Sequence, residues 1–151
     1  MDDKEIAEQL RLDLLICFAA YSASHAFSRF YRPTLDRLGL TYPQFVVMMV
    51  LWERQKTTMK ALSEEVLLES NTLTPLLKKL EAAGLVRRTR NTDDERVLDI
   101  EVTEQGMALK LDAKLMALEL AKASGETLEG VIELQQRLVK MRKNVEKASA
   151  G

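Results

Sequence analysis

The apolar periodicity of the chain changes at Gly84, and this change constrains the fold more than any other feature of the sequence. Before Gly84 the apolar residues recur at helical spacing in short segments. After it, LVRRTR (85–90) and RVLDIEV (96–102) contain β-branched residues, and the polar cluster NTDDE (91–95) separates them. The second of these segments alternates apolar and polar side chains, which is the two-residue period of a strand. The sequence therefore predicts a β-hairpin directly after a series of short helices.

Capping residues divide the helical part into short elements. TYPQ (41–44) is a capping box with proline in the first turn, so it should begin a helix through FVVMMVLWE (45–53). Thr58 is expected to cap KALSEEVLL (60–68), and Ser70 to cap NTLTPLLKKLEAA (71–83). Gly84 should end that helix in a Schellman-type turn with Leu85 as the apolar residue after it. A short helix, a turn, a second helix and a basic hairpin form a winged helix-turn-helix. We therefore expect a mainly α fold with a small β-hairpin wing.

Longer helical segments flank this lobe. Residues 5–38 are predicted to form one helix, kinked at Pro33 and ended by Gly39, with apolar residues on more than one side. Residues 103–123 and about 127–148 should form two further helices around a break at Ser124-Gly125.

A helix that is apolar on more than one side needs more than one partner surface. At 151 residues the natural expectation is one domain, large enough for a real core. We therefore expect a single domain over 1–151, with a winged helix-turn-helix lobe at 41–103 and, at 5–38 and 104–148, helices whose apolar sides need a further partner surface.

Cations concentrate around the second helix of the lobe and the first strand. Residues 75–92 hold five cations against one acid, in a chain whose net charge is −1. A helix in the major groove turns its N-terminal residues toward base edges, and cations beside it contact phosphates. Asparagine can bond adenine and threonine methyl groups suit thymine, so we expect A·T-rich half-sites. The candidates for base contacts are Ser70, Asn71, Thr72 and Thr74, and those for phosphate contacts are Lys78, Lys79, Arg87, Arg88 and Arg90.

The hairpin tip carries a further candidate. Arg96 follows Asp94 closely at the end of the polar cluster and could enter a minor groove. The alternative for all these cations is an ordinary solvated charged surface.

The composition limits the compartment and the cofactors. No apolar run approaches the ~20 residues of a membrane span, and the first ten residues are acidic and polar, unlike a signal peptide. The single cysteine, Cys17, cannot form an intrachain disulfide, which suits a reducing compartment. One cysteine and one histidine leave almost nothing for a metal site. We expect a cytoplasmic protein with no metal, no cofactor and no membrane contact.

Two segments carry a resemblance to a known family. VLLESNTLTPLLKKLEAAGLVRRTRNTDDERVLDIEVTEQG (66–106) resembles the DNA-binding core of the MarR family, including the D-x-R wing motif of Asp94 and Arg96 and the V-T-x-x-G that follows. CFAAYSASHAFSRFYRPTLDRLGLTYPQFVVMMVLWE (17–53) resembles the organic-hydroperoxide repressors of that family, the OhrR branch, through Cys-x3-Tyr, Y-R-P and L-G-L-T-Y-P-Q. Together the matches cover roughly residues 10–110. The resemblance implies a homodimeric repressor rather than an enzyme, with a DNA-binding lobe at 41–103 and dimerisation helices at 5–38 and 104–148. Double-stranded operator DNA would be its partner and an organic hydroperoxide its inducer.

The resemblance also implies roles for the thiol and the tyrosines. Cys17 would be the redox-sensing residue, and Tyr31, Tyr42 and Tyr21 would stabilise its thiolate. In a helix over 5–38, Cys17 lies too far from the N-terminus to use the helix dipole, so phenolic hydroxyls are the remaining donors. Tyr21 is about 6 Å along the same face, whereas Tyr31 is about 21 Å along the axis. Tyr31 could therefore approach only the Cys17 of an antiparallel partner helix.

The sequence departs from part of the OhrR branch in one respect. Some of those repressors carry a second cysteine near the start of the last helix, close to residues 125–127, and this chain has none. A disulfide between two different positions is therefore excluded. Oxidised Cys17 would have one of three fates: it is capped by a small thiol, it cyclises to a sulfenamide, or it oxidises further.

Other functions remain open from the sequence. The chain could be a MarR-type regulator released by a phenolic or aromatic ligand, with Cys17 as an inert core residue. A one-cysteine peroxidase would leave the basic hairpin unexplained, and a helical interaction module would not bind duplex DNA in a salt-dependent way.

Overall fold

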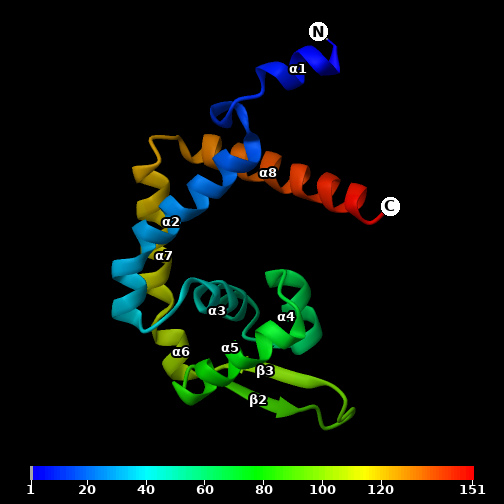
Figure 1. The fold of residues 1–151 in the computed structure, drawn as a ribbon. Coiled ribbons are helices and arrows are strands. Elements are labelled where there is room, and N and C mark those ends of the chain that lie inside the picture. The colour runs from blue at the N-terminus through cyan, green and yellow to red at the C-terminus, as the bar shows by residue number, and fades with distance from the viewer. Residues whose placement is uncertain (1) are drawn as a thin grey trace. The chain divides into compact units, whose positions relative to one another are not determined.

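A computed structural model of the protein describes residues 2–151 and consists of helices and one small sheet (Figure 1). Its elements fall into two compact units, of which the first ends at Ala113 and the second runs from Lys114 to Gly151. The elements in chain order are α1 (Asp3–Gln9), the 3-10 turn η1 (Leu12–Leu14), α2 (Ile16–Leu38), α3 (Tyr42–Arg54), β1 (Lys56–Thr58), α4 (Met59–Val66), α5 (Ser70–Ala82), β2 (Val86–Arg90), β3 (Leu98–Val102), α6 (Glu104–Ala108), α7 (Lys110–Ala123) and α8 (Leu128–Ser149).

The sheet of the first unit confirms the predicted hairpin and adds a third strand. β2 and β3 are antiparallel, with Val86 opposite Val102. β1 pairs with the other edge of β3, with Thr57 opposite Ile100, so the strand order is β1-β3-β2. The period of the sequence could not predict β1, because three residues are too few to display an alternation.

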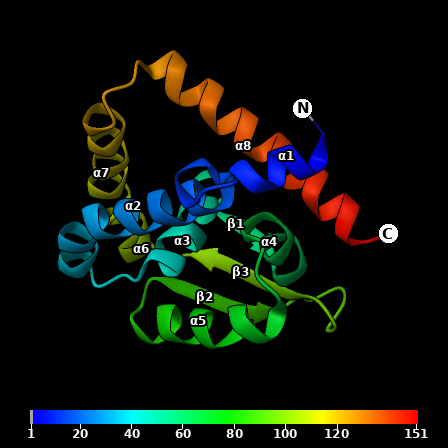
Figure 2. The same ribbon diagram turned by 45° about the horizontal axis from the view of Figure 1, so that its top comes forward.

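Three helices pack on this sheet and form the core of the lobe. Figure 2 shows α5 lying along the β2–β3 hairpin, and α3 and α4 also contact β3. Burial of apolar side chains is the main source of stability in such a lobe. The largest fully buried side chains of the lobe are Met48, Leu51, Trp52, Leu62, Leu73, Leu77, Leu80 and Ile100.

The helix ends of the lobe confirm three of the four predicted caps. Thr41 and Gln44 form the reciprocal capping box of α3, and Thr58 accepts the N–H of Ala61 at the start of α4. Gly84 has a φ of 75°, and the N–H of Leu85 bonds the carbonyl of Leu80 at 3.0 Å, as the Schellman motif requires.

The predicted cap of α5 is wrong. Glu69 is the N-cap, without a side-chain cap bond, and Ser70 is already the first helical residue. The helix begins one residue early because the N–H of Leu73 bonds the carbonyl of Glu69 at 2.9 Å.

The predicted single helix over 5–38 is also wrong at its N-terminal end. A capping box of Asp2 and Glu5 starts the separate helix α1. The backbone is then extended at Leu10 and again at Leu15, directly before α2. The apolar row through Leu10 and Leu14 suggested one helix, yet both side chains are exposed in this chain, so no packing holds that segment helical.

The rest of α2 agrees with the sequence more closely. Pro33 lies inside α2 without ending it, and Gly39 ends the helix with a φ of 70°.

The second unit contains most of α7 and all of α8. Gly125, with a φ of 76°, separates the two helices as predicted, and Thr127 caps α8. The predicted helix over 103–123 is divided, because the N–H of Leu109 bonds the nearer carbonyls of Gly106 and Met107 and so ends α6. None of the helices formed by residues 2–151 is long and apolar enough to cross a membrane.

Candidate functional site

The predicted DNA-facing residues begin at the N-terminus of α5. Ser70, Asn71 and Thr72 are exposed in its first turn, whereas Leu73 and Leu77 are buried and hold the helix on the core. The helical period thus turns one side of α5 into the lobe and leaves the polar first turn free. The hydroxyl of Thr74 donates to the carbonyl of Ser70 at 2.7 Å, so its methyl group is the part left to contact another molecule.

A hollow of about 800 Å³ lies between α5, the start of α4 and the hairpin. It brings together six of the predicted residues: Ser70, Thr74, Lys78, Arg88, Arg90 and Arg96. Asn71, Thr72, Lys79, Arg87 and Asp94 do not line it. The hollow holds five cations and one acid, Glu64. Two of the cations are paired with acids beside the hollow, and the positive charge that remains in excess favours a polyanion.

Lys60 is a lining residue that the sequence analysis missed. It lies in the first turn of α4, two residues after the capping residue Thr58. In a helix-turn-helix the first helix crosses the DNA backbone, so a cation at its start was the signal that could have identified Lys60.

Two of the predicted phosphate-binding arginines are held by acids of the lobe. The guanidinium of Arg88 donates to Glu81 at 2.9 and 3.2 Å, and the backbone N–H of Arg88 donates to the same carboxylate at 3.0 Å. These hydrogen bonds lower the pKa of Glu81. Arg87 lies 3.7 Å from Glu101. Arg88 therefore ties the end of α5 to β2, and Lys78, Lys79 and Arg90 are the freer cations.

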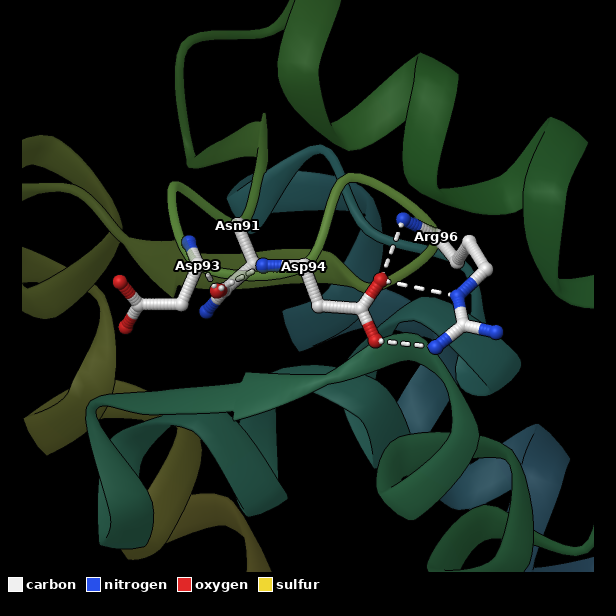
Figure 3. Close-up of polar contacts among 4 residues, drawn as sticks. All are labelled: Asn91, Asp93, Asp94 and Arg96. Carbon is white, nitrogen blue, oxygen red and sulfur yellow. Dashed lines mark hydrogen bonds and ion pairs between the residues drawn. The ribbon is translucent and has the colours of Figure 1, made fainter.

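At the hairpin tip the guanidinium of Arg96 is held by the carboxylate of Asp94 (Figure 3). Nε and one terminal nitrogen of Arg96 donate to the two oxygens of Asp94 at 3.0 and 3.1 Å, and the backbone N–H of Arg96 donates at 3.1 Å. The side chain of Arg96 is nevertheless 90% exposed. The hydrogen bonds from Arg96 lower the pKa of Asp94 below its ordinary value of 3.8. This bidentate ion pair, the fork of Asp94, therefore persists at neutral pH.

Cys17 is a free, exposed thiol in the first turn of α2. The expectation that it lies deep in a helix is wrong, because α2 begins at Ile16 and makes Cys17 its second residue. N–H groups of a first helical turn lack partners inside the helix and carry a partial positive charge. The position can therefore support a negative charge on the sulfur. Within this chain Cys17 is not a core residue either.

The three tyrosines lie in two places. Tyr31 is buried where α2 meets α3, with its ring 6.0 Å from that of Tyr42 and 5.7 Å from that of Phe45. Burial raises the pKa of Tyr31, and the nearby Tyr42 raises it further, so this phenol keeps its proton at neutral pH. Tyr21 is exposed and contacts His25, with ring centroids 4.4 Å apart. Tyr31 and Tyr42 thus lie together, but fourteen residues of straight helix, about 21 Å, separate Tyr31 from the Cys17 of its own chain.

Metal-binding clusters are not found in the described part of the chain. Residues 2–151 contain no group of three or more His, Cys, Asp or Glu side chains placed to hold an ion.

Comparison with known proteins places this arrangement in a family. A model described as transcriptional regulator SarA/Rot matches residues 29–113. The chain is 44% identical to the HTH-type transcriptional regulator TtmR of Methylorubrum extorquens, over 87% of this chain and 67% of that protein. It is 40% identical to the organic hydroperoxide resistance transcriptional regulator of Bacillus subtilis, over 81% of this chain and 85% of that one.

Solved structures share the fold as well. AbfR of Staphylococcus epidermidis superposes with a TM-score of 0.78 at 34% identity, covering 93% of this chain and 97% of that one. AbfR has also been solved bound to DNA in its reduced and its overoxidised forms, each with a TM-score of 0.76 to this chain.

Proposed function

Because the chain belongs to the MarR/SarA-type winged-helix family of DNA-binding transcriptional regulators, we propose that it is a homodimeric repressor that senses organic hydroperoxides through Cys17. Oxidation of the thiol releases the operator. The observation that carries this proposal is the exposed thiol in the first turn of α2. The 40% identity to a regulator named for organic hydroperoxide resistance supports the class of oxidant.

We assign the DNA contacts to the exposed side of α5, the hollow beside it and the hairpin tip. The first turn of α5, with Ser70, Asn71 and Thr72, enters the major groove, and Thr74 offers its methyl group to thymine. Lys78, Lys79 and Arg90 contact phosphates, joined by Lys60 at the start of α4. Arg88 and Arg87 contribute positive charge while their acid partners hold them. Arg96, supported by Asp94, enters the minor groove.

The homodimer follows from apolar surface that this chain leaves uncovered. On α2 the side chains of Phe18, Phe27 and Phe30 are each at least 40% exposed. α8 has no buried residue, and a row of its apolar side chains is exposed: Leu128, Ile132, Leu134, Leu138, Met141 and Val145. Exposed apolar side chains in such numbers along each of these two helices mark a partner interface. A second copy is the partner that the family resemblance suggests. Two recognition helices then reach half-sites about 34–36 Å apart.

The sensing step is a two-electron oxidation of the thiol. The sulfur anion of Cys17 attacks the terminal oxygen of the hydroperoxide, the O–O bond breaks, and the corresponding alcohol leaves after taking up a proton. The sulfur loses two electrons and becomes a sulfenic acid. A small thiol then displaces water from the sulfenic acid and caps Cys17 as a mixed disulfide.

Two of the three tyrosines act on this thiol from the other subunit. Antiparallel packing of two α2 helices would bring Tyr31 and Tyr42 of one subunit toward Cys17 of its partner. The raised pKa of Tyr31 keeps its hydroxyl protonated, so it can donate a hydrogen bond to a sulfur anion. Tyr21, one turn from Cys17 on the same helix, is a third donor. Oxidation alters these contacts, shifts the dimer helices and changes the spacing of the two lobes.

The proposal is tested by operator binding before and after oxidation. A fluorescent duplex containing the DNA upstream of the protein's own gene is titrated with protein, untreated or treated with cumene hydroperoxide. We expect the treated protein to lose affinity, and protein alkylated at Cys17 beforehand to lose the response to peroxide. A phenolic ligand that releases DNA equally from native and alkylated protein, with no effect of peroxide on either, would instead support a ligand-controlled regulator.

A further inference from the structure

We infer that Asn91 is a positioning residue for Arg96, because it shapes the wing tip from which Arg96 projects. This inference rests on the proposed contact between Arg96 and DNA. Asn91 directly follows β2 and lies outside the wing motif of Asp94 and Arg96. Its side chain makes hydrogen bonds both to the tip and to the sheet.

The side-chain oxygen of Asn91 organises the tip. It accepts the backbone N–H of Asp93 at 2.9 Å and that of Asp94 at 3.1 Å (Figure 3). Backbone hydrogen bonds close the same loop. The N–H of Asn91 donates to the carbonyl of Val97 at 2.9 Å, and the N–H of Val97 donates to the carbonyl of Asp94 at 2.9 Å. Asn91 thereby fixes the backbone that carries the Asp94 carboxylate.

The side-chain nitrogen of Asn91 anchors this tip to the central strand. It donates to Asp99 of β3 at 3.1 Å, and Asp99 is only 7% exposed. A buried carboxylate needs partners, and the second one is Lys56 of β1, with its Nζ 3.4 Å away. The tip is therefore connected through Asn91 to all three strands of the sheet, whereas Asp94 and Arg96 alone form a contact at the surface.

The orientation of Arg96 depends on this connection. The guanidinium is 90% exposed and lies in the fork of Asp94. An arginine already held in its binding geometry loses less side-chain freedom when it enters a groove. If Asn91 is removed, the N–H groups of Asp93 and Asp94 lose their acceptor, the Asp94 carboxylate moves and the fork no longer points Arg96 in one direction.

A double-mutant cycle tests the inference on the full-length protein. Asn91→Ala, Arg96→Ala and the double variant are titrated against a duplex selected from a random-sequence pool by the wild-type protein, with affinity measured by fluorescence anisotropy. We expect Arg96→Ala to weaken binding about fivefold or more. Asn91→Ala should weaken it at least about threefold in the wild type, yet by less than about 1.5-fold when Arg96 is already alanine, because coupled residues are not additive.

Two further variants control for the fold. Thr92→Ala removes an exposed polar side chain from the same turn and should leave the affinity unchanged. If Asn91→Ala does not fold, as judged by circular dichroism, Asn91→Ser takes its place in the cycle, since a serine hydroxyl can accept a turn N–H more weakly.

The possible results separate the two levels of the proposal. An equal loss on removing Asn91 in both backgrounds would overturn the positioning role and leave the Arg96 contact intact. No loss from Asn91→Ala in the wild type would overturn it as well. An Arg96→Ala protein with unchanged affinity would refute the Arg96 contact itself, and the role of Asn91 would fall with it.

Discussion

Replacing Gly106 with alanine should destabilise the winged lobe, although alanine is usually the better helix residue. Gly106 is buried in α6, and the indole N–H of Trp52 donates to its carbonyl at 2.9 Å. A Cβ at this position would overlap the carbonyl oxygen of Leu85 and lie 2.9 Å from a methyl carbon of Val102. Leu85 cannot easily move away, because its carbonyl accepts the N–H of Thr103 at 3.1 Å.

The change in the free energy of unfolding has one stabilising and two destabilising contributions. Glycine to alanine in a helix stabilises by about 0.5–1 kcal/mol. Overpacking of a filled site costs about 1–3 kcal/mol. Loss of the bond between Leu85 and Thr103 adds about 1 kcal/mol. The free energy of unfolding should therefore fall by about 1–3.5 kcal/mol.

Urea unfolding followed by circular dichroism measures this change at a fixed protein concentration. Gly130→Ala is the matched control, because Gly130 also lies in a helix but an added Cβ would meet chiefly the mobile end of Glu126, at 2.7 Å. Its stability should stay within about 1 kcal/mol of the wild type. If Gly106→Ala and Gly130→Ala have the same stability, the close packing of α6 on Leu85 is refuted.

Three other substitutions test separate parts of the site. Lys78→Ala should weaken binding to all duplexes alike and reduce the slope of log affinity against log salt by about one, measured by anisotropy at several salt concentrations. Urea unfolding should show that Glu81→Gln is less stable than the wild type at pH 7 and that this difference shrinks as the pH falls below 4.5. The lowered pKa of Glu81 means that its pairing with Arg88 stabilises the fold above the ordinary value of 4.5 and is lost as the pH falls through the lower folded-state pKa. Tyr31→Phe should fold and bind DNA but respond to organic hydroperoxide more slowly in a time course of operator release.

The elements that sequence alone predicted are those with a local cause. The hairpin follows from its two-residue alternation, and the ends of α3, α4 and α5 from Thr41, Thr58 and Gly84, whose caps involve neighbours in the chain. The assignment of DNA binding to 41–103 and of dimerisation to the flanking helices stays a prediction.

The features that sequence missed depend on distant partners. β1 exists because β3 supplies its hydrogen bonds, and Lys60 joins the hollow because α4 is folded beside α5. Asn91 is one residue of a polar turn in the sequence, and its link to Asp99 requires the paired strands.

The prediction that differs most in its consequences from the structure is the place of Cys17 within its helix. Apolar residues at helical spacing on both sides of Leu15 predict one helix. The backbone is extended at Leu15, however, and a new helix begins after it. The thiol is therefore in a first turn, where the helix itself can stabilise a negative charge, and the tyrosines are not its only donors.

Oxidation of Cys17 is expected to control DNA binding, and operator release by Cys17→Ser tests this directly. The variant should fold, dimerise and bind the operator like the wild type, because a hydroxyl nearly matches the thiol in size. Treated with cumene hydroperoxide beside the wild type, it should stay on the DNA, since serine cannot form a sulfenic acid. Mass spectrometry of the released wild type should show Cys17 as a mixed disulfide when a small thiol is present. If the Cys17→Ser protein leaves its operator on peroxide treatment as the wild type does, Cys17 is not the sensor.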